Sequence, residues 1–337
     1  MLLTRRNVLP ITAGAAAWPL ASYAQQPTLP VIGFLSSGSP RTFAKFTDAF
    51  RQGLRSQGYT EGRDVWIDYR WAEGHYGELP GLAADLVQRQ VGLIIAAGGI
   101  ASAQSAKNAT TNIPVLFVAG FDPVQIKLVS SLNNPGGNVS GVSVFSTELA
   151  TKRLELLRDL IPGAKTIAIL VNPGTTAAGI EIKDSTYGIE TESATAAAQV
   201  LGVALVVLDA VTEADLEAAF ALAVRRQAGA LLVSADPFFT IRRAQLVALA
   251  ARHALPTMYP WREYVEGGGL VSYGTELTWA YQQIGIYAGR ILKGAKPTEL
   301  PVQLPTNFEL VINLKTAKAL GLTVPPLVQA RVNEAIE

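Results

Sequence analysis

Apolar residues along this chain fall into short runs that are separated by segments of helical periodicity. Residues 30–35 form one such run, and Phe43, Phe46, Phe50 and Leu54 follow at the spacing of one helix face. Further strands are predicted at residues 65–69, 91–97 and 114–118. Strands that are apolar throughout are typical of a parallel sheet covered by helices on both faces.

A second series of the same kind begins after the turn cluster at residues 133–138. A helix is predicted over residues 150–160, with Lys152 and Arg153 on its outer face. Strands are predicted at residues 166–171, 203–208, 230–234 and 256–259. Two consecutive series of this kind predict an α/β protein with two Rossmann-like lobes.

The end of the chain does not form a third unit. There the sequence predicts a strand at residues 270–273, a helix at 276–292 and short strands at 301–304 and 308–312. Extra elements of this kind suit a chain that crosses back between two lobes and forms a hinge. We therefore place one lobe at residues 28–145 plus 272–301, and the other at 146–271 plus 302–337.

Composition excludes several classes of protein. The chain has 337 residues, 28 basic against 27 acidic side chains and no cysteine. The balanced charge gives no reason to expect a nucleic acid or an anionic membrane surface as partner. Without cysteine there is no disulfide, thiolate metal site or lipid-anchored cysteine, and two histidines are too few for a multi-histidine metal centre.

Residues 1–24 have the features of a signal peptide. Arg5 and Arg6 precede an apolar stretch at residues 8–20 that is too short to span a bilayer. Small residues at 22–24 predict cleavage before Gln25. The arginine pair is similar to a twin-arginine signal, and the general secretion route stays open. We expect an exported, periplasmic protein that is soluble and has no stable membrane insertion.

Signatures of catalysis and of cofactor binding are absent. The sequence has no G-x-G-x-x-G after its first strand, no phosphate loop and no G-x-S-x-G. His75, in the loop formed by residues 74–77, is interpreted as a surface or pocket-rim residue. We therefore expect neither catalytic residues nor a cofactor.

Several segments resemble one known family in the right order. They are the stretches at residues 120–124, 132–143, 152–157, 162–165, 172–173, 267–274, 291–297 and 310–322. They are similar to the ABC-transporter substrate-binding family that includes tryptophan- and tyrosine-binding proteins. The resemblance implies a type I periplasmic-binding fold, with two lobes joined by three crossovers and a ligand between them. It also implies an ABC permease and its ATPase as partners, and we expect a monomer.

The ligand is expected beyond the carboxyl ends of the strands, where helix N-termini offer free N–H groups. The candidate residues are Ser36, Ser37, Gly98, Gly99, Ser102, Gly120, Asp122, Asn172, Tyr187, Asp236 and Tyr259, with Trp261 as a further aromatic wall. We expect first-lobe N–H groups and serine hydroxyls to hold a ligand carboxylate. Asp236 would then bind a ligand ammonium group or, alternatively, cap a helix. The same choice between ligand contact and helix cap applies to Asp122.

The sequence departs from the family pattern at several positions, and the first of those named here bears on the ligand. No hydroxyl residue stands before Ser102 at Gly99-Ile100, and Lys127 replaces an expected glycine. An aromatic acid or another small carboxylate therefore stays open beside an amino acid. A ligand-sensing module for a membrane receptor and an exported α/β enzyme are the alternative functions.

Overall fold

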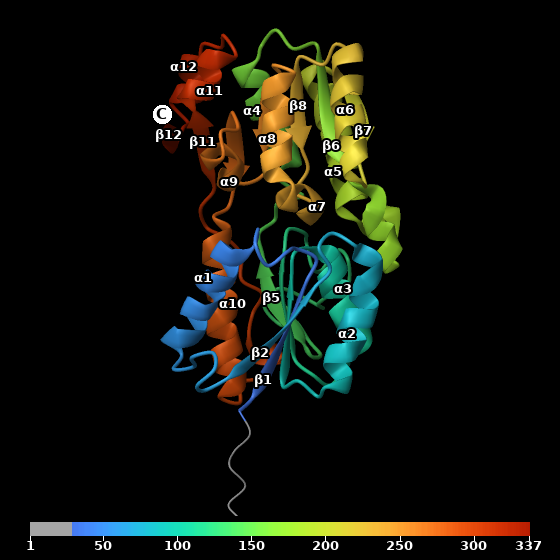
Figure 1. Ribbon diagram of the computed structural model, residues 1–337, viewed down its shortest axis with the longest axis vertical. Coiled ribbons are helices and arrows are strands. Elements are labelled where there is room, and N and C mark those ends of the chain that lie inside the picture. Colours follow the sequence, from blue (N-terminus) through green and yellow to red (C-terminus); the bar gives the residue numbers. More distant parts are fainter. Residues whose placement is uncertain (1–28) are drawn as a thin grey trace, which may run out of the picture.

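The computed structural model describes residues 29–337, and the predicted signal peptide at residues 1–24 lies outside them. Two sheets occupy opposite ends of an elongated molecule (Figure 1). One sheet has five strands and the other has seven, so each is the centre of one lobe. None of the helices within the described residues has both the length and the apolarity needed to cross a bilayer.

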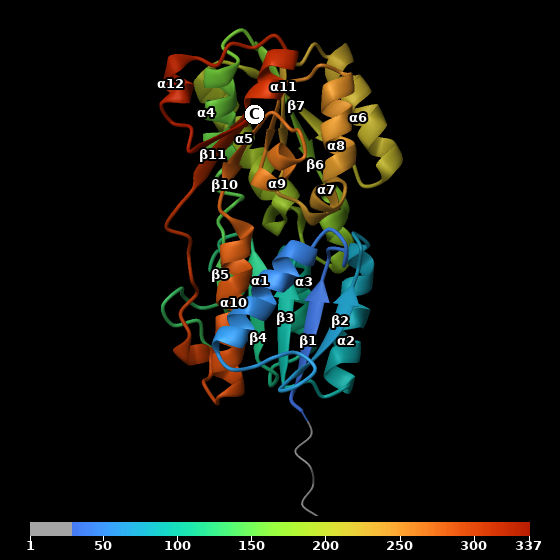
Figure 2. The same ribbon diagram turned by 60° about the vertical axis from the view of Figure 1, so that its left-hand side comes forward.

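Lobe I contains the five-stranded sheet in the order β2-β1-β3-β4-β5, and all its neighbouring strands are parallel. Its strands are β1 (Val31–Ser36), β2 (Trp66–Trp71), β3 (Leu93–Ala97), β4 (Val115–Ala119) and β5 (Val139–Ser143). Its helices are α1 (Ala44–Ser56), η1 (Tyr76–Glu78), α2 (Leu79–Gln88), α3 (Ile100–Ala109), α10 (Leu277–Leu292) and η4 (Pro297–Glu299). Helices α1 and α10 cover one face, and α2 and α3 cover the other (Figures 1 and 2).

Lobe II contains the seven-stranded sheet in the order β12-β11-β10-β9-β8-β6-β7, in which only β10 and β11 pair antiparallel. Its strands are β6 (Thr166–Val171), β7 (Ala204–Asp209), β8 (Ala230–Val233), β9 (Thr257–Tyr259), β10 (Val271–Gly274), β11 (Glu309–Asn313) and β12 (Glu334–Ile336). Its helices are α4 (Ala150–Leu160), η2 (Pro173–Ala178), η3 (Ile182–Asp184), α5 (Thr186–Leu201), α6 (Glu213–Arg225), α7 (Pro237–Ile241), α8 (Arg243–Arg252), α9 (Arg262–Glu266), α11 (Leu314–Ala319) and α12 (Pro326–Gln329).

The chain passes between the lobes three times, after β5, after β10 and after η4. The predicted two-lobed α/β architecture with a three-crossover hinge is therefore confirmed. The boundary placed between residues 271 and 272 is wrong, because it falls inside β10. That strand pairs with β9 through Ser272 and with β11 through Gly274, so the second crossover begins after Gly274.

Two short segments near the hinge differ from the sequence prediction. Residues 301–304 do not form a strand, and Gln303 makes only a single parallel bridge to Val142. Pro301 and Pro305 flank this segment, and neither can donate to a ladder. Strand β5 was not predicted, because its serines replace the usual apolar residues. The Ser140 hydroxyl is nevertheless buried, because it donates a hydrogen bond to the Leu300 carbonyl.

Helix α10 packs against α1 at a point where neither helix carries a side chain. A Cβ atom added to Gly53 would lie 2.1 Å from the Gln282 carbonyl oxygen, and one added to Gly285 would lie 2.1 Å from the Phe50 carbonyl oxygen. This close approach fixes a helix from late in the chain onto the first helix of lobe I. The fold of lobe I therefore depends on residues from both ends of the described chain.

We predict that Gly53→Ala lowers the free energy of unfolding by about 1–3 kcal/mol, because α10 has to move away from α1. Gly81→Ala in α2 is the matched control, since a Cβ atom there meets nothing within 4 Å. It should be neutral or stabilising by up to about 1 kcal/mol. Urea unfolding followed by circular dichroism measures both, and equal stability of the two variants would contradict the packing argument.

Candidate functional site

A cleft between the lobes contains a cavity of about 50 Å³. Its lining residues are Phe43, Gly98, Gly99, Val118, Ala119, Gly120, Val144, Ser146, Ala235, Pro237, Thr240, Trp261, Leu277 and Tyr281. Both lobes and the first crossover contribute to this set. Pockets for small molecules usually enclose about 300 Å³ or more. The lobes are therefore drawn together in this structure, and a ligand has to enter when they part.

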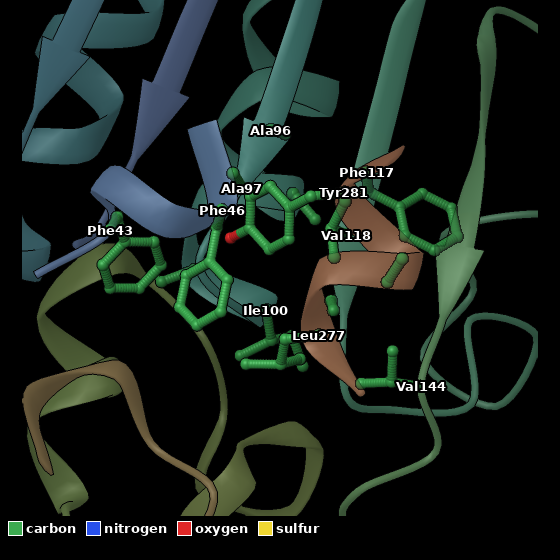
Figure 3. Packing of buried hydrophobic residues seen from close by; sticks show 14 of the residues in the cluster. Phe43, Phe46, Ala96, Ala97, Ile100, Phe117, Val118, Val144, Leu277 and Tyr281 are labelled. Atoms are coloured by element: carbon green, nitrogen blue, oxygen red, sulfur yellow. The ribbon is translucent and has the colours of Figure 1, made fainter. Parts of the chain in front are cut away.

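Aromatic and apolar side chains form most of the cavity wall. Phe43 lies just before α1 and Tyr281 lies on α10, with their ring centroids 6.5 Å apart and nearly perpendicular. Figure 3 shows these rings together with Leu277 and Val144. Lobe II contributes Trp261, which is buried and lines the same cavity, as the sequence predicted. Walls of this kind suit the apolar or aromatic body of a ligand.

The glycines predicted at the strand ends of lobe I do lie at the cavity. Gly98 and Gly99 have φ angles of 77° and 97°, which glycine adopts without strain. A Cβ atom on Gly99 would lie 3.2 Å from Cγ of Pro237 in the other lobe. Gly120 also lines the cavity, and its carbonyl accepts from the Thr147 N–H at 2.8 Å. Glycine at these positions lets the lobes approach closely.

The three predicted serines have a different role from the one expected. Ser36, Ser37 and Ser102 are fully buried, and none of them lines the cavity. The Ser36 hydroxyl accepts from the Gly38 N–H at 3.0 Å, and the Ser102 hydroxyl accepts from the Ser37 N–H at 3.0 Å. The Ser37 hydroxyl donates to the Gly98 carbonyl. The serines therefore brace the loops that carry Gly98 and Gly99.

Asp236 is a buried acidic residue that does not itself line the cavity, although its two chain neighbours Ala235 and Pro237 do. Its Oδ1 atom accepts from Asn172 Nδ2 at 3.0 Å, from the Phe238 N–H at 2.9 Å and from the Tyr76 hydroxyl. Asp236 thus caps α7, as one of the two interpretations expected. Oδ2 is buried and has no partner within residues 29–337. Burial raises the pKa of this carboxyl, and the three hydrogen bonds offset part of the increase.

The side chains of Arg153 and Glu190 lie close together, both buried, behind the cavity wall. Their side chains are each 1% exposed, and Nη1 lies 3.9 Å from Oε1. Arg153 Nη1 donates to the Ser146 carbonyl at 2.8 Å, and both Glu190 oxygens accept from the Ala235 N–H at 3.2 Å. Burial raises the pKa of Glu190 to about 8, although the Arg153 charge acts in the opposite direction.

Tyr187, Tyr259 and Asp122 do not line the cavity either. Tyr187 packs on the core of lobe II, and Tyr259 stacks on Tyr264 with a centroid distance of 4.7 Å. Tyr259 lines a separate groove of about 520 Å³ on lobe II. Asp122 caps the turn after it, since its Oδ1 accepts from the Val124 N–H at 2.8 Å.

The sequence analysis missed Tyr76 and Arg153. Arg153 was expected on the outer face of its helix, and this expectation is wrong because the side chain is buried. Leu149, Arg153 and Leu157 share one helix face, so the spacing contained a signal for burial. Tyr76 had no such signal, because its partner Asp236 lies 160 residues away along the chain. No group of three or more acidic or histidine side chains within residues 29–337 is placed to hold a metal ion.

Two parallel-stranded lobes, three crossovers and a cavity between the strand ends define a ligand-binding protein of the type I periplasmic-binding fold. The family model described as ABC transporter substrate binding protein matches residues 31–336. The chain therefore belongs to the ABC transporter substrate-binding protein family, as the resemblance implied.

Relatives of this chain include proteins of described ligand specificity. The chain is 28% identical over 282 residues to a tyrosine-binding protein from Clostridioides difficile (strain R20291), covering 82% of this chain and 77% of the relative. It is also similar to the structure of an ABC domain in complex with L-Trp from Streptococcus pneumonia. That match has a TM-score of 0.78 and 25% identity over 92% of this chain and all of the other.

A third comparison concerns the arrangement of the lobes. The ligand-free, open structure of a substrate-binding protein with adhesive properties from Clostridium difficile is 26% identical. It matches with a TM-score of 0.62 over 91% of this chain and 99% of the other. Identity and coverage are close to those for the L-Trp complex, yet the TM-score is lower. The chain as a whole therefore superposes better on the L-Trp complex than on the open structure.

We predict that Glu190→Gln changes how stability depends on pH. Above a pKa of about 4.5 the unfolded chain has lost the Glu190 proton, whereas the folded chain keeps it up to about pH 8. The wild-type free energy of unfolding should therefore fall, relative to the variant, as pH rises from 5 to 8. The fall should exceed about 1.4 kcal/mol, the value of one pKa unit. Urea titrations at several pH values measure the free energy of unfolding of both proteins. A difference between wild type and variant that stays constant with pH would contradict the raised pKa of Glu190.

Proposed function

We propose that this protein is the exported receptor of an ABC importer and captures a small organic ligand between its lobes. An amino acid with an aromatic side chain is the first candidate. Membership of the substrate-binding family supports the importer role. The tyrosine-binding relative and the similar L-Trp complex support the ligand class.

The buried carboxylate of Asp236 is the observation that carries the ligand assignment. A carboxylate oxygen that is buried without a partner costs free energy, and a ligand ammonium group at Oδ2 removes that cost through a charge-assisted hydrogen bond. Phe43, Trp261 and Tyr281 then contact the ligand's aromatic body. An amino acid satisfies both parts of the site.

The ligand carboxylate is assigned to the start of α3. The first N–H groups of a helix have no acceptor within the helix and attract anions. Gly99 caps α3 and lines the cavity, so these N–H groups begin at the cavity wall. The serine hydroxyls expected to share this task are bonded to other loop atoms. The carboxylate therefore depends on the backbone of residues 99–101.

The importer role implies an ABC permease and its ATPase as partners. The paired-arginine leader at residues 1–24 supports export to the periplasm. We infer a monomeric receptor that binds and releases its ligand unchanged and is not an enzyme.

We predict that L-tyrosine and L-tryptophan raise the thermal stability of the mature protein. A ligand at about one hundred times its dissociation constant adds about 2.7 kcal/mol to the free energy of unfolding. Thermal-shift measurements should compare both amino acids with their deaminated analogues. Stabilisation by the analogues alone would replace the amino acid with an aromatic acid, and stabilisation by neither group would overturn the ligand class.

We predict that Asp236→Asn weakens the binding of these amino acids by about ten- to a hundredfold, because one hydrogen bond to a charged group is lost. Titration calorimetry measures the affinity. Asp209→Asn, at the exposed end of β7, is the matched control and should bind normally. Unchanged affinity in Asp236→Asn would show that the ammonium group binds elsewhere.

A further inference from the structure

The loop between β2 and α2 presents Tyr76 to the opposite lobe. Glu73 and Gly74 have φ angles of 49° and 88°, so the chain reverses sharply after the strand. The N–H groups of Glu73 and Gly74 donate to the carbonyls of Gly38 at 3.0 Å and Ser37 at 2.8 Å. These hydrogen bonds hold the loop against the residues that follow β1, and they fix the backbone position of Tyr76.

The Tyr76 side chain is 4% exposed, and its hydroxyl bonds only to groups of lobe II in this structure. The hydroxyl donates to Asp236 Oδ1 and accepts from the Phe238 N–H at 3.1 Å. Asp236 and Phe238 belong to the start of α7, whereas Tyr76 starts η1 in lobe I. This contact exists only while the lobes are together.

The contact fixes the orientation of the Asp236 carboxylate. Tyr76, Asn172 and the Phe238 N–H all donate to Oδ1, and Oδ2 has no partner in the described part of the chain. Two of these donors belong to lobe II and remain when the lobes separate. Only the Tyr76 hydroxyl joins when the lobes close, and burial strengthens a hydrogen bond to a charged group.

We propose that Tyr76 is a positioning residue of the binding site. It completes the set of donors around Asp236 Oδ1, directs Oδ2 at the ligand and links ligand binding to closure of the lobes. The part that concerns the ligand rests on the proposed function, whereas the part that concerns closure does not. Tyr76→Phe keeps the ring and removes only the hydroxyl.

A designed disulfide measures closure without any ligand. A Cβ atom on Gly77 would lie 3.8 Å from Cβ of Ala177, across the lobes, which is about the usual separation in a disulfide. The chain has no cysteine of its own, so a Gly77→Cys and Ala177→Cys pair can bond only to itself within one molecule. Its rate of oxidation reports how often the lobes come together.

In this cysteine pair, Tyr76→Phe should slow oxidation by about tenfold, as expected for one hydrogen bond to a buried charge. Tyr69→Phe is the matched control and should oxidise at the parent rate, since the Tyr69 hydroxyl bonds to Arg51 within lobe I. Unchanged oxidation in Tyr76→Phe overturns the proposal. Failure of the parent pair to oxidise overturns it as well, because the lobes then do not reach this arrangement.

A second measurement tests the link to binding, with L-tyrosine and L-tryptophan as probes of the cysteine-free protein. Tyr76→Phe should raise the dissociation rate by about tenfold and leave the association rate nearly unchanged, because the hydroxyl acts only after closure. If the substitution only destabilised the fold, thermal stability would fall, but the effect on binding would not be confined to the dissociation rate. If neither probe binds the wild type, the proposed ligand fails, and the disulfide measurement still decides the role of Tyr76 in closure.

Discussion

The guanidinium of Arg153 lies where two of the three connections between the lobes meet. Its Nε atom donates to the Tyr273 carbonyl at 2.7 Å, and Nη1 donates to the Ser146 carbonyl at 2.8 Å. Tyr273 belongs to β10, just before the second crossover, and Ser146 belongs to the first. A guanidinium that is 1% exposed needs such acceptors, because an unpaired buried charge is very costly. The path of the hinge, and with it the direction in which each lobe faces, depends on this side chain.

With the hinge fixed in this way, the carboxyl ends of both sheets face each other. One apolar cluster extends from lobe I into one side of lobe II and includes Phe43, Phe238 and Trp261. Closing the lobes therefore removes apolar surface from water. This favours closure but does not fix how the lobes are positioned relative to each other. Polar contacts between the lobes set their relative position. They include those of Tyr76, the Arg243 hydrogen bond to the Thr42 carbonyl at 3.3 Å and the pairing of Lys45 with Glu263 and Glu266 at 3.5 and 3.6 Å.

The sequence predicted the fold well because its signals are local. Apolar runs and helical spacing gave most of the strands and helices, and the turn glycines Gly98 and Gly99 marked a real wall of the cavity. The weak points were segments whose role depends on neighbours. Strand β5 was not predicted because it contains two serines. Ser37 and Ser102 were assigned to a ligand, although they hydrogen-bond to other loop atoms.

Local sequence signals specify two α/β lobes with a site at the strand ends, since each βα unit is formed by residues close together. Which side chains reach that site depends on tertiary packing. Tyr187 packs on the core of lobe II, Tyr259 stacks on Tyr264, and Arg153 is turned inward to the hinge. Tyr76 meets Asp236 across 160 residues of chain, and a contact of that kind exists only once the two lobes have folded and docked.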